Sequence, residues 1–242
     1  MEIIKQLIKK VFYLFGYQVS QVGEDISIKV SLRMLIADLL LKQGNLFFVQ
    51  VGAYDGKSND PIYEIVKKHR LNGILIEPQV AIFEKLKENY SNLANLIFLN
   101  AAISDKDGFQ VLYKVSSHPE SPDWADQLAS FNKANILKHR HALPQVEELI
   151  LEEKVETISP TTLVKNYKIQ AIDLLIIDTE GYDYDIIKLF DSTGIKPKII
   201  FFKSIHLGDS YQKCIDFLTT RNYKVSLLGN DSLALLDSSN TV

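Results

Sequence analysis

The sequence is poor in cysteine, because Cys214 is the only one among 242 residues. One thiol can neither form a disulfide within the chain nor supply a site of several thiolate ligands, so both classes are excluded. No run of about 18 apolar residues occurs, which excludes an ordinary transmembrane helix. Lys5, Lys9 and Lys10 interrupt the apolar residues near the amino terminus and spoil a signal-peptide core. We therefore expect a cytoplasmic location.

An excess of basic residues is also missing. Lys and Arg number 27 against 30 Asp and Glu, which gives a formal net charge of −3. A general nucleic-acid partner is disfavoured, because such proteins usually carry a basic excess. The 46% hydrophobic and 24% charged residues are typical of a globular protein. The length suits one large α/β domain with at most a small appendage.

Residues 1–45 are predicted to form a helical extension. Met1–Tyr17 has a helical period of apolar residues with lysines opposite, and a second helical stretch, Leu32–Lys42, ends near Gly44. Two interpretations stay open for the first helix. It covers the edge of a core, or it lies as a basic amphipathic helix on the inner face of a membrane, peripheral to it.

From Leu46 onwards, short apolar runs alternate with helical periods. This pattern predicts a doubly wound, mostly parallel α/β sheet, because strands buried on both faces need crossover helices. The chain ends in a predicted antiparallel hairpin, so residues 46–242 form the main domain. The expected strands are Leu46–Val51, Gly73–Ile76, Leu96–Leu99, Ile172–Asp178, Lys198–Phe202, Tyr223–Leu228 and Ser232–Leu236; the expected helices are Pro61–Leu71, Val80–Asn89, Tyr184–Leu189 and Tyr211–Thr220.

Residues 116–152 do not follow this alternation. The segment is too long for a simple connection, and such insertions are often binding lids. It carries Trp124, Phe131 and His139, which we expect to contact a substrate. The alternative is a surface excursion without function.

The strand Leu46–Val51 leads into a turn that contains Gly52 and Gly56 and then into a helix. Gly52 would let the backbone approach a ligand, and Gly56 would allow a tight turn. The turn is no P-loop and lacks the full dinucleotide fingerprint, so it is a weak signal alone. Glu77 ends the next strand about 20 residues later, where nucleotide-binding folds hold a ribose. An exposed strand-end carboxylate is the alternative.

Two further strand ends carry small or acidic residues. Asn100-Ala101-Ala102 would accommodate an adenine ring, or simply end a strand. Asp178-Thr179-Glu180-Gly181-Tyr182-Asp183 places carboxylates where they would orient or deprotonate a substrate, or bind a divalent metal. Asp183 is equally well explained as a cap of the next helix.

Taken in order, VGAYDGKSND, LIEP, NAAIS, VETIS and IDLLIIDTEGYDYDIIK resemble the FkbM family of S-adenosylmethionine-dependent methyltransferases over about residues 46–236. The resemblance implies a class I methyltransferase (Rossmann-like) fold and methylation of a hydroxyl on a sugar, a glycan or a small natural product. The resemblance assigns Gly52, Asp55 and Gly56 to the cofactor loop, Glu77 to the ribose, and Ala101 and Ala102 to the adenine. The other residues that we expect to bind the cofactor are Ala53, Tyr54, Pro78, Asn100 and Asp178. The resemblance also places Asp178, Glu180 and Gly181 beside the reacting methyl group. We further expect Tyr182 and Lys203 to contact the substrate.

One motif departs from the family pattern. Members similar to this chain often read FFEHxHL after the fifth strand, whereas this chain has Phe201-Phe202-Lys203-Ser204-Ile205-His206-Leu207. Lys203 would pair with Asp178 or Glu180 and hold them ionised, or its presence marks altered chemistry. The alternative function is therefore a non-catalytic or weakly active cofactor-binding module derived from a methyltransferase.

For a hydroxyl acceptor, a side chain must remove the proton. His206 is the first candidate, because imidazole titrates near neutrality. Asp178, with Glu180 beside it, is the second, and His139 and His141 come third. A metal-dependent variant would use Asp178, Glu180 and His206 as ligands, although no metal is assigned.

Overall fold

The structure is a computed structural model that describes residues 18–22, 25–29, 31–116, 121–122 and 124–237. The chain divides into two units, Met1–Leu46 and Phe47–Val242. The helix predicted over Met1–Tyr17 lies outside the described residues. Among the helices that are described, none combines the length and the apolar character needed to cross a bilayer.

The first unit contains a hairpin and one helix. Strands β1 (Gln18–Val22) and β2 (Asp25–Lys29) pair antiparallel. Helix α2 (Leu32–Gln43) begins after Ser31, whose hydroxyl accepts a hydrogen bond from the Met34 N–H, and it ends at Gly44 in the left-handed conformation. The predicted helix Leu32–Lys42 corresponds to α2, whereas the antiparallel pair of β1 and β2 was not predicted for the helical extension.

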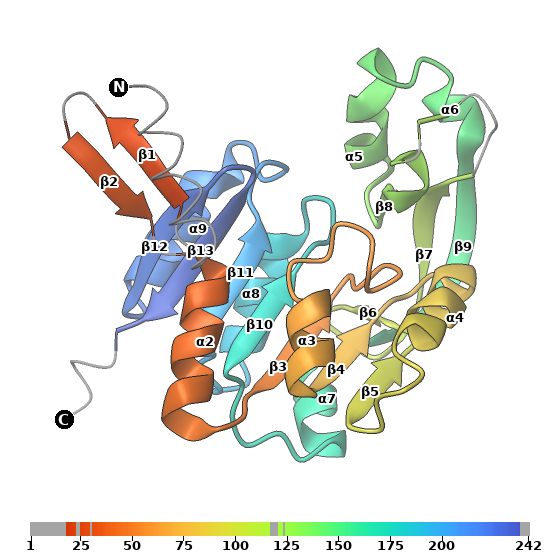
Figure 1. The fold of residues 1–242 in the computed structure, drawn as a ribbon. Coiled ribbons are helices and arrows are strands. Elements are labelled where there is room, and N and C mark those ends of the chain that lie inside the picture. Colours follow the sequence, from red (N-terminus) through yellow and green to blue (C-terminus); the bar gives the residue numbers. More distant parts are fainter. Residues whose placement is uncertain (1–17, 23–24, 30, 117–120, 123, 238–242) are drawn as a thin grey trace. The chain divides into compact units, whose positions relative to one another are not determined.

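The second unit is built on a seven-stranded sheet in the order β12-β13-β11-β10-β3-β4-β5 (Figure 1). Its strands are β3 (Phe47–Val51), β4 (Asn72–Ile76), β5 (Leu96–Leu99), β10 (Leu174–Ile177), β11 (Ile199–Lys203), β12 (Tyr223–Leu228) and β13 (Asp231–Leu236). The strands from β5 to β11 are parallel, whereas β13 runs antiparallel to both β11 and β12. The predicted doubly wound, mostly parallel sheet with a C-terminal antiparallel hairpin is confirmed.

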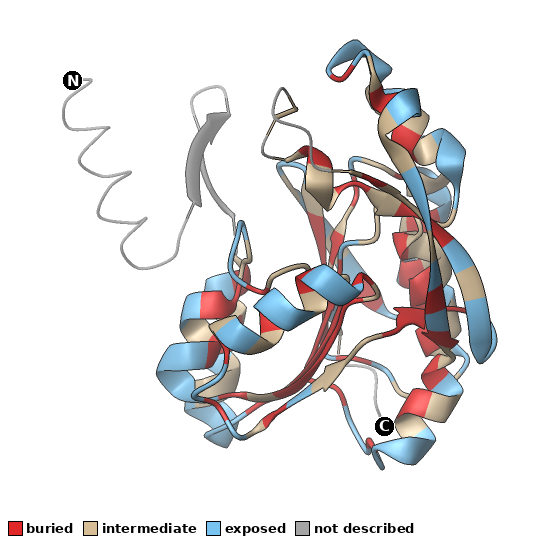
Figure 2. Ribbon diagram, turned by 90° about the vertical axis from the view of Figure 1, so that its right-hand side faces the viewer, coloured by how far each residue is buried: buried red, intermediate tan, exposed pale blue. Residues whose placement is uncertain are grey.

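Helices cover both faces of this sheet (Figure 1). Helices α7 (Pro160–Asn166), α8 (Asp183–Asp191) and α9 (Ser210–Thr219) pack on one face, where alternate strand residues such as Val49, Ile74 and Leu175 form the core with them. Helix α3 (Tyr63–His69) lies on the opposite face, and α4 (Val80–Asn89) follows β4. The inner strands β3, β4 and β10 are almost continuously buried, and the helices are buried on their inner sides only (Figure 2), which is the pattern of a parallel sheet between helical layers.

A second sheet, which the sequence did not predict, carries the insertion. Its order is β6-β9-β7-β8, from β6 (Ala102–Ile103), β7 (Gly108–Val115), β8 (Ala129–Ser130) and β9 (Ile150–Ile158). Between β7 and β9 lie η1 (Ala125–Gln127), α5 (Lys133–Leu137), η2 (Lys138–His141) and α6 (Val146–Leu149). These elements enclose a small apolar cluster that includes Leu128, Ile136 and Leu143. The insertion is therefore a packed substructure and not an irregular loop.

Candidate functional site

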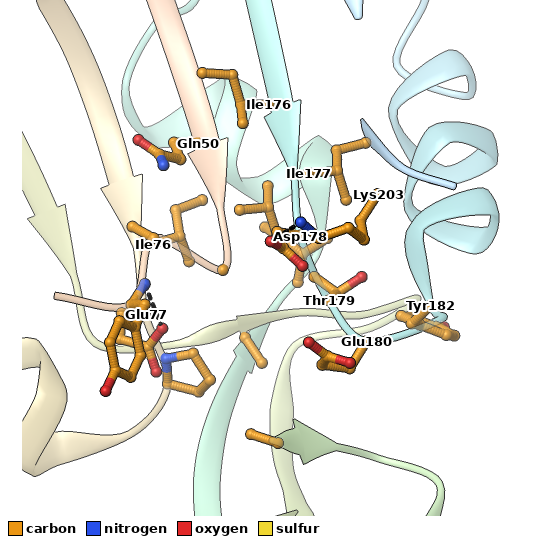
Figure 3. A pocket seen from close by; sticks show the side chains of 18 of the residues that line it. Gln50, Ile76, Glu77, Ile176, Ile177, Asp178, Thr179, Glu180, Tyr182 and Lys203 are labelled. Atoms are coloured by element: carbon orange, nitrogen blue, oxygen red, sulfur yellow. Dashed lines mark hydrogen bonds and ion pairs between the residues drawn. The ribbon is translucent and has the colours of Figure 1, made fainter. Parts of the chain in front are cut away.

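A cavity of about 340 Å³ opens at the carboxyl ends of β3, β4, β10 and β11, a volume in the range of small-molecule sites. The crossover connections leave β3 and β10 in opposite directions, and ligands of doubly wound sheets bind at such a switch point. Figure 3 shows Glu77 on one side of the cavity and Asp178, Glu180 and Lys203 on the other. The same cavity is thus lined by the carboxylate at the end of β4 and by the charged residues after β10 and at the end of β11.

Gly52 sits where β3 meets β10. Its φ is +75°, and a Cβ built on it would lie 1.9 Å from the backbone oxygen of Asp178. The Gly52 N–H donates to the carbonyl of Ile76 at 3.0 Å, so this turn is held against both neighbouring strands. Only glycine fits here, because the backbone of Asp178 occupies the space that a side chain would need.

Glu77 is 3% exposed at the end of β4. Its carboxylate accepts hydrogen bonds from the N–H of Tyr54 and the N–H of Gln79, both at 2.9 Å. Burial raises the pKa of Glu77 to about 7 despite these two donors. Each oxygen keeps a second lone pair, so the carboxylate can still accept from the hydroxyls of a ribose.

A buried amide marks another part of the cavity wall. Gln50 lies within β3, and its Nε2 donates to Oδ2 of Asp60 at 2.6 Å. Its Oε1 is buried without a hydrogen-bond partner among the described residues. A buried acceptor without a donor costs free energy, which a bound ligand with N–H groups would recover. The turn at Gly52, the carboxylate of Glu77 and this amide fit S-adenosylmethionine, whose ribose hydroxyls and ammonium group are donors.

On the other side of the cavity, Lys203 lies between two carboxylates. Its Nζ is 3.5 Å from Oδ2 of Asp178 and 3.3 Å from Oδ1 of Asp231. Burial lowers the pKa of Lys203, but the two carboxylate charges outweigh burial and the pKa is raised. The predicted pairing of Lys203 with Asp178 is confirmed. The lysine charge acts in the expected direction and lowers the pKa of Asp178, but burial outweighs it and the pKa of that carboxyl is raised.

Glu180 and His206 form a second polar pair. The Nε2 of His206 lies 3.3 Å from Oε2 of Glu180. Burial raises the pKa of Glu180 to about 8, and the charges of Asp178 and Asp183 add to this effect. Burial lowers the pKa of His206 to about 4, with a further contribution from His139. Glu180 lines the cavity and His206 does not. His206, the first candidate for proton removal, therefore contacts the cavity wall through Glu180.

Asp183 has a structural position. It is fully buried, and its carboxylate accepts hydrogen bonds from the Thr179 hydroxyl at 2.9 Å and from the Lys203 N–H at 3.1 Å. It therefore ties the loop after β10 to the end of β11. Burial raises the pKa of Asp183 to about 7, with the Asp178 charge acting in the same direction.

The insertion supplies part of the cavity wall. Phe131 lines the cavity and meets Tyr182 edge-on, with 6.2 Å between ring centroids. The Tyr54 hydroxyl donates to Asp126 of η1 at 2.9 Å, which links the insertion to the glycine turn. Tyr54 itself has a φ of +49°, a rare conformation for a residue with a side chain. The insertion thus contacts both the cofactor side and the acidic side.

Most of the predicted site residues line the cavity: Gly52, Ala53, Tyr54, Glu77, Pro78, Ala101, Ala102, Phe131, Asp178, Glu180, Tyr182 and Lys203. The others do not line it and have different contacts. The carboxylate of Asp55 caps its own turn through the N–H groups of Lys57 and Ser58, and Gly56 faces Leu86 and Tyr90.

Three more predicted residues lie outside the wall. Asn100 donates to the backbone carbonyls of Glu77 and Pro78, and so positions the carboxylate strand end. Trp124 packs on the ring of His139, with 5.7 Å between centroids, and His139 lies 5.9 Å from the ring of His206. These residues support the site from behind.

Sequence reasoning also missed part of the wall: Gln50, Ser58, Asn59, Asp60, Pro61, Gln79, Gln127, Ala129, Ser130 and Asp231. Gln50 could have been recognised from the sequence, because it is the one polar residue of the strand FFVQV. Asp231 could not have been recognised from the sequence, since only the pairing of β13 with β11 places it opposite Lys203.

Comparison with known proteins identifies related structures at low similarity. They include methyltransferase FkbM from Methylobacillus flagellatus (12% identity, TM-score 0.49, 83% of this chain and 47% of that chain) and the S-adenosylhomocysteine-bound methyltransferase PaMTH1 of Podospora anserina (10%, TM-score 0.47, 84% and 76%). An O-methyltransferase from Bacillus cereus, also in complex with S-adenosylhomocysteine, has 10% identity and a TM-score of 0.45, and the match covers 95% of this chain and 89% of that chain. This chain spans about half the length of the Methylobacillus protein. No curated protein matches the chain.

The family comparison is stronger. The model described as the methyltransferase FkbM domain matches residues 50–225, which is well over half of the chain. The match covers the glycine turn, Glu77, the acidic block after β10 and the insertion, and it agrees with a class I methyltransferase sheet. The chain therefore belongs to the FkbM methyltransferase family.

Proposed function

We propose that this protein transfers the methyl group of S-adenosylmethionine to a hydroxyl of a sugar, a glycan or a small natural product. S-adenosylmethionine is the methyl donor implied by membership of the family, in agreement with the sequence prediction. The hydroxyl acceptor is the proposed part. One observation carries it: a single cavity joins the cofactor side at Gly52 and Glu77 to the carboxylates Asp178 and Glu180.

The methyl group passes directly from the donor to the acceptor, so the protein forms no covalent bond to either. The acceptor oxygen forms a bond to the methyl carbon, the carbon–sulfur bond breaks, and sulfur keeps the electron pair. The protein must align the oxygen with the methyl group and take up the hydroxyl proton. Glu180 borders the cavity and contacts His206, so we assign proton uptake to Glu180, with His206 as the residue that positions it. Phe131 and Tyr182 offer aromatic faces to a sugar ring.

The direct test is turnover. The full chain is incubated with S-adenosylmethionine and a panel of sugars, glycans and hydroxylated natural products. We expect S-adenosylhomocysteine and a methyl ether to form in equal amounts with at least one acceptor. Methylation of nitrogen or sulfur alone would contradict the hydroxyl assignment. Tight cofactor binding without turnover on any acceptor would favour the binding module.

Replacing Glu77 by alanine should weaken binding of S-adenosylhomocysteine by about 1–3 kcal/mol, because the ribose hydroxyls lose a charged acceptor. The pKa of Glu77 is about 7, and the ionised form is the better acceptor. Affinity of the wild type should therefore rise as the pH increases through about 7. Calorimetry at pH 6, 7 and 8 checks both effects.

The matched control is Glu88→Ala, which removes an exposed carboxylate from α4. Its affinity should equal that of the wild type at each pH. If Glu77→Ala binds as tightly as the wild type, or keeps the wild-type pH dependence, Glu77 does not hold the ribose.

A further inference from the structure

Three potential metal ligands meet beside the cavity. His139, Glu180 and His206 each offer one ligand atom, and these atoms all lie within 4.8 Å of one another. His139 comes from η2 of the insertion, Glu180 from the loop after β10, and His206 from the loop after β11. All three are partly buried. Segments far apart in the sequence thus converge on one point.

The fold holds these segments together without help from the three side chains. The amide of Asn135 in α5 donates to the backbone carbonyl of Glu180 at 3.1 Å. Gly181 has no Cβ, and one built there would lie 3.1 Å from the Asn135 amide and 3.2 Å from the carbonyl of His206. The insertion and the two core loops therefore pack closely at Gly181, which brings η2 and its His139 next to Glu180.

We propose that His139, Glu180 and His206 bind one divalent transition-metal ion, with Zn²⁺ as the representative ion. Bonds of 2.0–2.2 Å in a tetrahedral site place neighbouring ligand atoms about 3.3 Å apart. The His206 Nε2 and Glu180 Oε2 already have this separation, 3.3 Å. The ligand atom of His139 lies within 4.8 Å of both of these atoms. Two imidazoles and one carboxylate leave a coordination position open, as in catalytic metal sites.

The composition of the site decides the class of ion. Imidazole nitrogens suit Zn²⁺, Co²⁺, Ni²⁺ and Fe²⁺, whereas Mg²⁺ and Ca²⁺ prefer oxygen ligands. The positive charges of Lys138 and Lys203 also act on His206. They would repel a cation that is held only by electrostatic attraction, so a bound ion needs coordination bonds to the imidazoles. This set differs from the one predicted from sequence, because Asp178 pairs with Lys203 and His139 takes its place.

The inference deepens the proposed function and rests on it only for the role of the ion. Glu180 borders the cavity, so the open coordination position would lie at the cavity's edge. A cation there would hold the acceptor hydroxyl and lower its pKa, and the carboxylate oxygen of Glu180 that does not bind the ion would take up the proton. The ion would also join η2 to the core across the cavity rim.

The test measures metal binding alone, without cofactor or acceptor. The full chain is treated with a chelator, dialysed and titrated with Zn²⁺ by calorimetry and with Co²⁺ by visible absorption. We expect one ion per chain and a ligand-field spectrum of a low-coordinate Co²⁺ site. His139→Ala, Glu180→Gln and His206→Ala should each weaken Zn²⁺ binding at least about tenfold. His141→Ala is the control, because His141 is an exposed neighbour in η2, and it should bind like the wild type.

Circular dichroism and thermal melting of each variant separate loss of a ligand from loss of the fold, and His139→Gln is the milder replacement if His139→Ala unfolds. The proposal is overturned if the wild type binds no stoichiometric ion, or if folded His139 and His206 variants bind as tightly as the wild type. A chain that methylates a hydroxyl but binds no metal refutes this site and keeps the proposed function. A chain that binds metal through these residues but methylates no hydroxyl confirms this site and refutes the proposed function.

Discussion

Gly52→Ala should abolish cofactor binding, with the affinity for S-adenosylhomocysteine falling at least about a hundredfold, or about 2.7 kcal/mol. The new methyl group would lie 1.9 Å from the carbonyl oxygen of Asp178. Because this contact is between two backbones, β3 and β10 would have to separate at their carboxyl ends. The cavity is built on that junction, so calorimetric titration should detect no binding in the measurable range.

The chain offers a matched control in Gly194→Ala. Gly194 has a φ of +79°, close to the +75° of Gly52, but a Cβ built on it meets nothing within 4 Å. Both alanines pay the left-handed penalty of about 1–2 kcal/mol, and only the one at Gly52 meets the steric conflict. Gly194→Ala should melt a few degrees lower and bind like the wild type. Equal affinities in the two variants would show that the Gly52 junction does not shape the cofactor site.

Glu180→Ala and His206→Ala should each lower kcat by about 10²–10⁴-fold, the usual contribution of a positioned acid or base. Glu180 borders the cavity and His206 contacts it from behind, so either change removes the route for the acceptor's proton. KM for S-adenosylmethionine should stay near the wild-type value, since neither residue lies on the Glu77 side. Steady-state kinetics with an acceptor found in the turnover screen, together with calorimetry, separates kcat from binding.

A split between kcat and KM distinguishes a positioning role for His206 from general damage, which would move both. His69→Ala is the control, because His69 is an exposed histidine at the end of α3, and it should have wild-type kinetics. If His206→Ala keeps full activity on an authentic acceptor, the assignment of His206 is wrong. Glu180, which lines the cavity, would then take up the proton without help from His206, and loss of activity in Glu180→Ala alone would show this.

The parallel sheet and its cofactor side were predictable because they depend on local patterns. The run of β10 is apolar throughout and that of β3 contains one polar residue, Gln50, which is the pattern of strands buried on both faces. The turn at Gly52 and the carboxylate of Glu77 stand where such strands end. Parallel strands bring their carboxyl ends to one edge, so the order of motifs already placed these residues together.

Residues within a turn were harder to assign, because sequence spacing does not show where a side chain points. Asp55 and Gly56 belong to the predicted cofactor turn, yet Asp55 caps that turn and Gly56 packs against Leu86 and Tyr90. Gln50 stands in the preceding strand and lines the cavity. The difference is set by the direction of each Cα–Cβ bond in the folded loop.

The family, the strands of the main sheet, the glycine turn and the carboxylate of Glu77 could be predicted from the sequence, since each of them is recognised in a short local motif. The second sheet could be seen only in the folded chain, because β7 and β9 pair across the whole insertion. The tertiary structure also decided the partners of the acidic group: Asp231 reaches Lys203 through the pairing of β13 with β11, and η2 brings His139 to Glu180 and His206. These contacts join residues tens of positions apart, and their cause is the packing of whole elements, which no local pattern records.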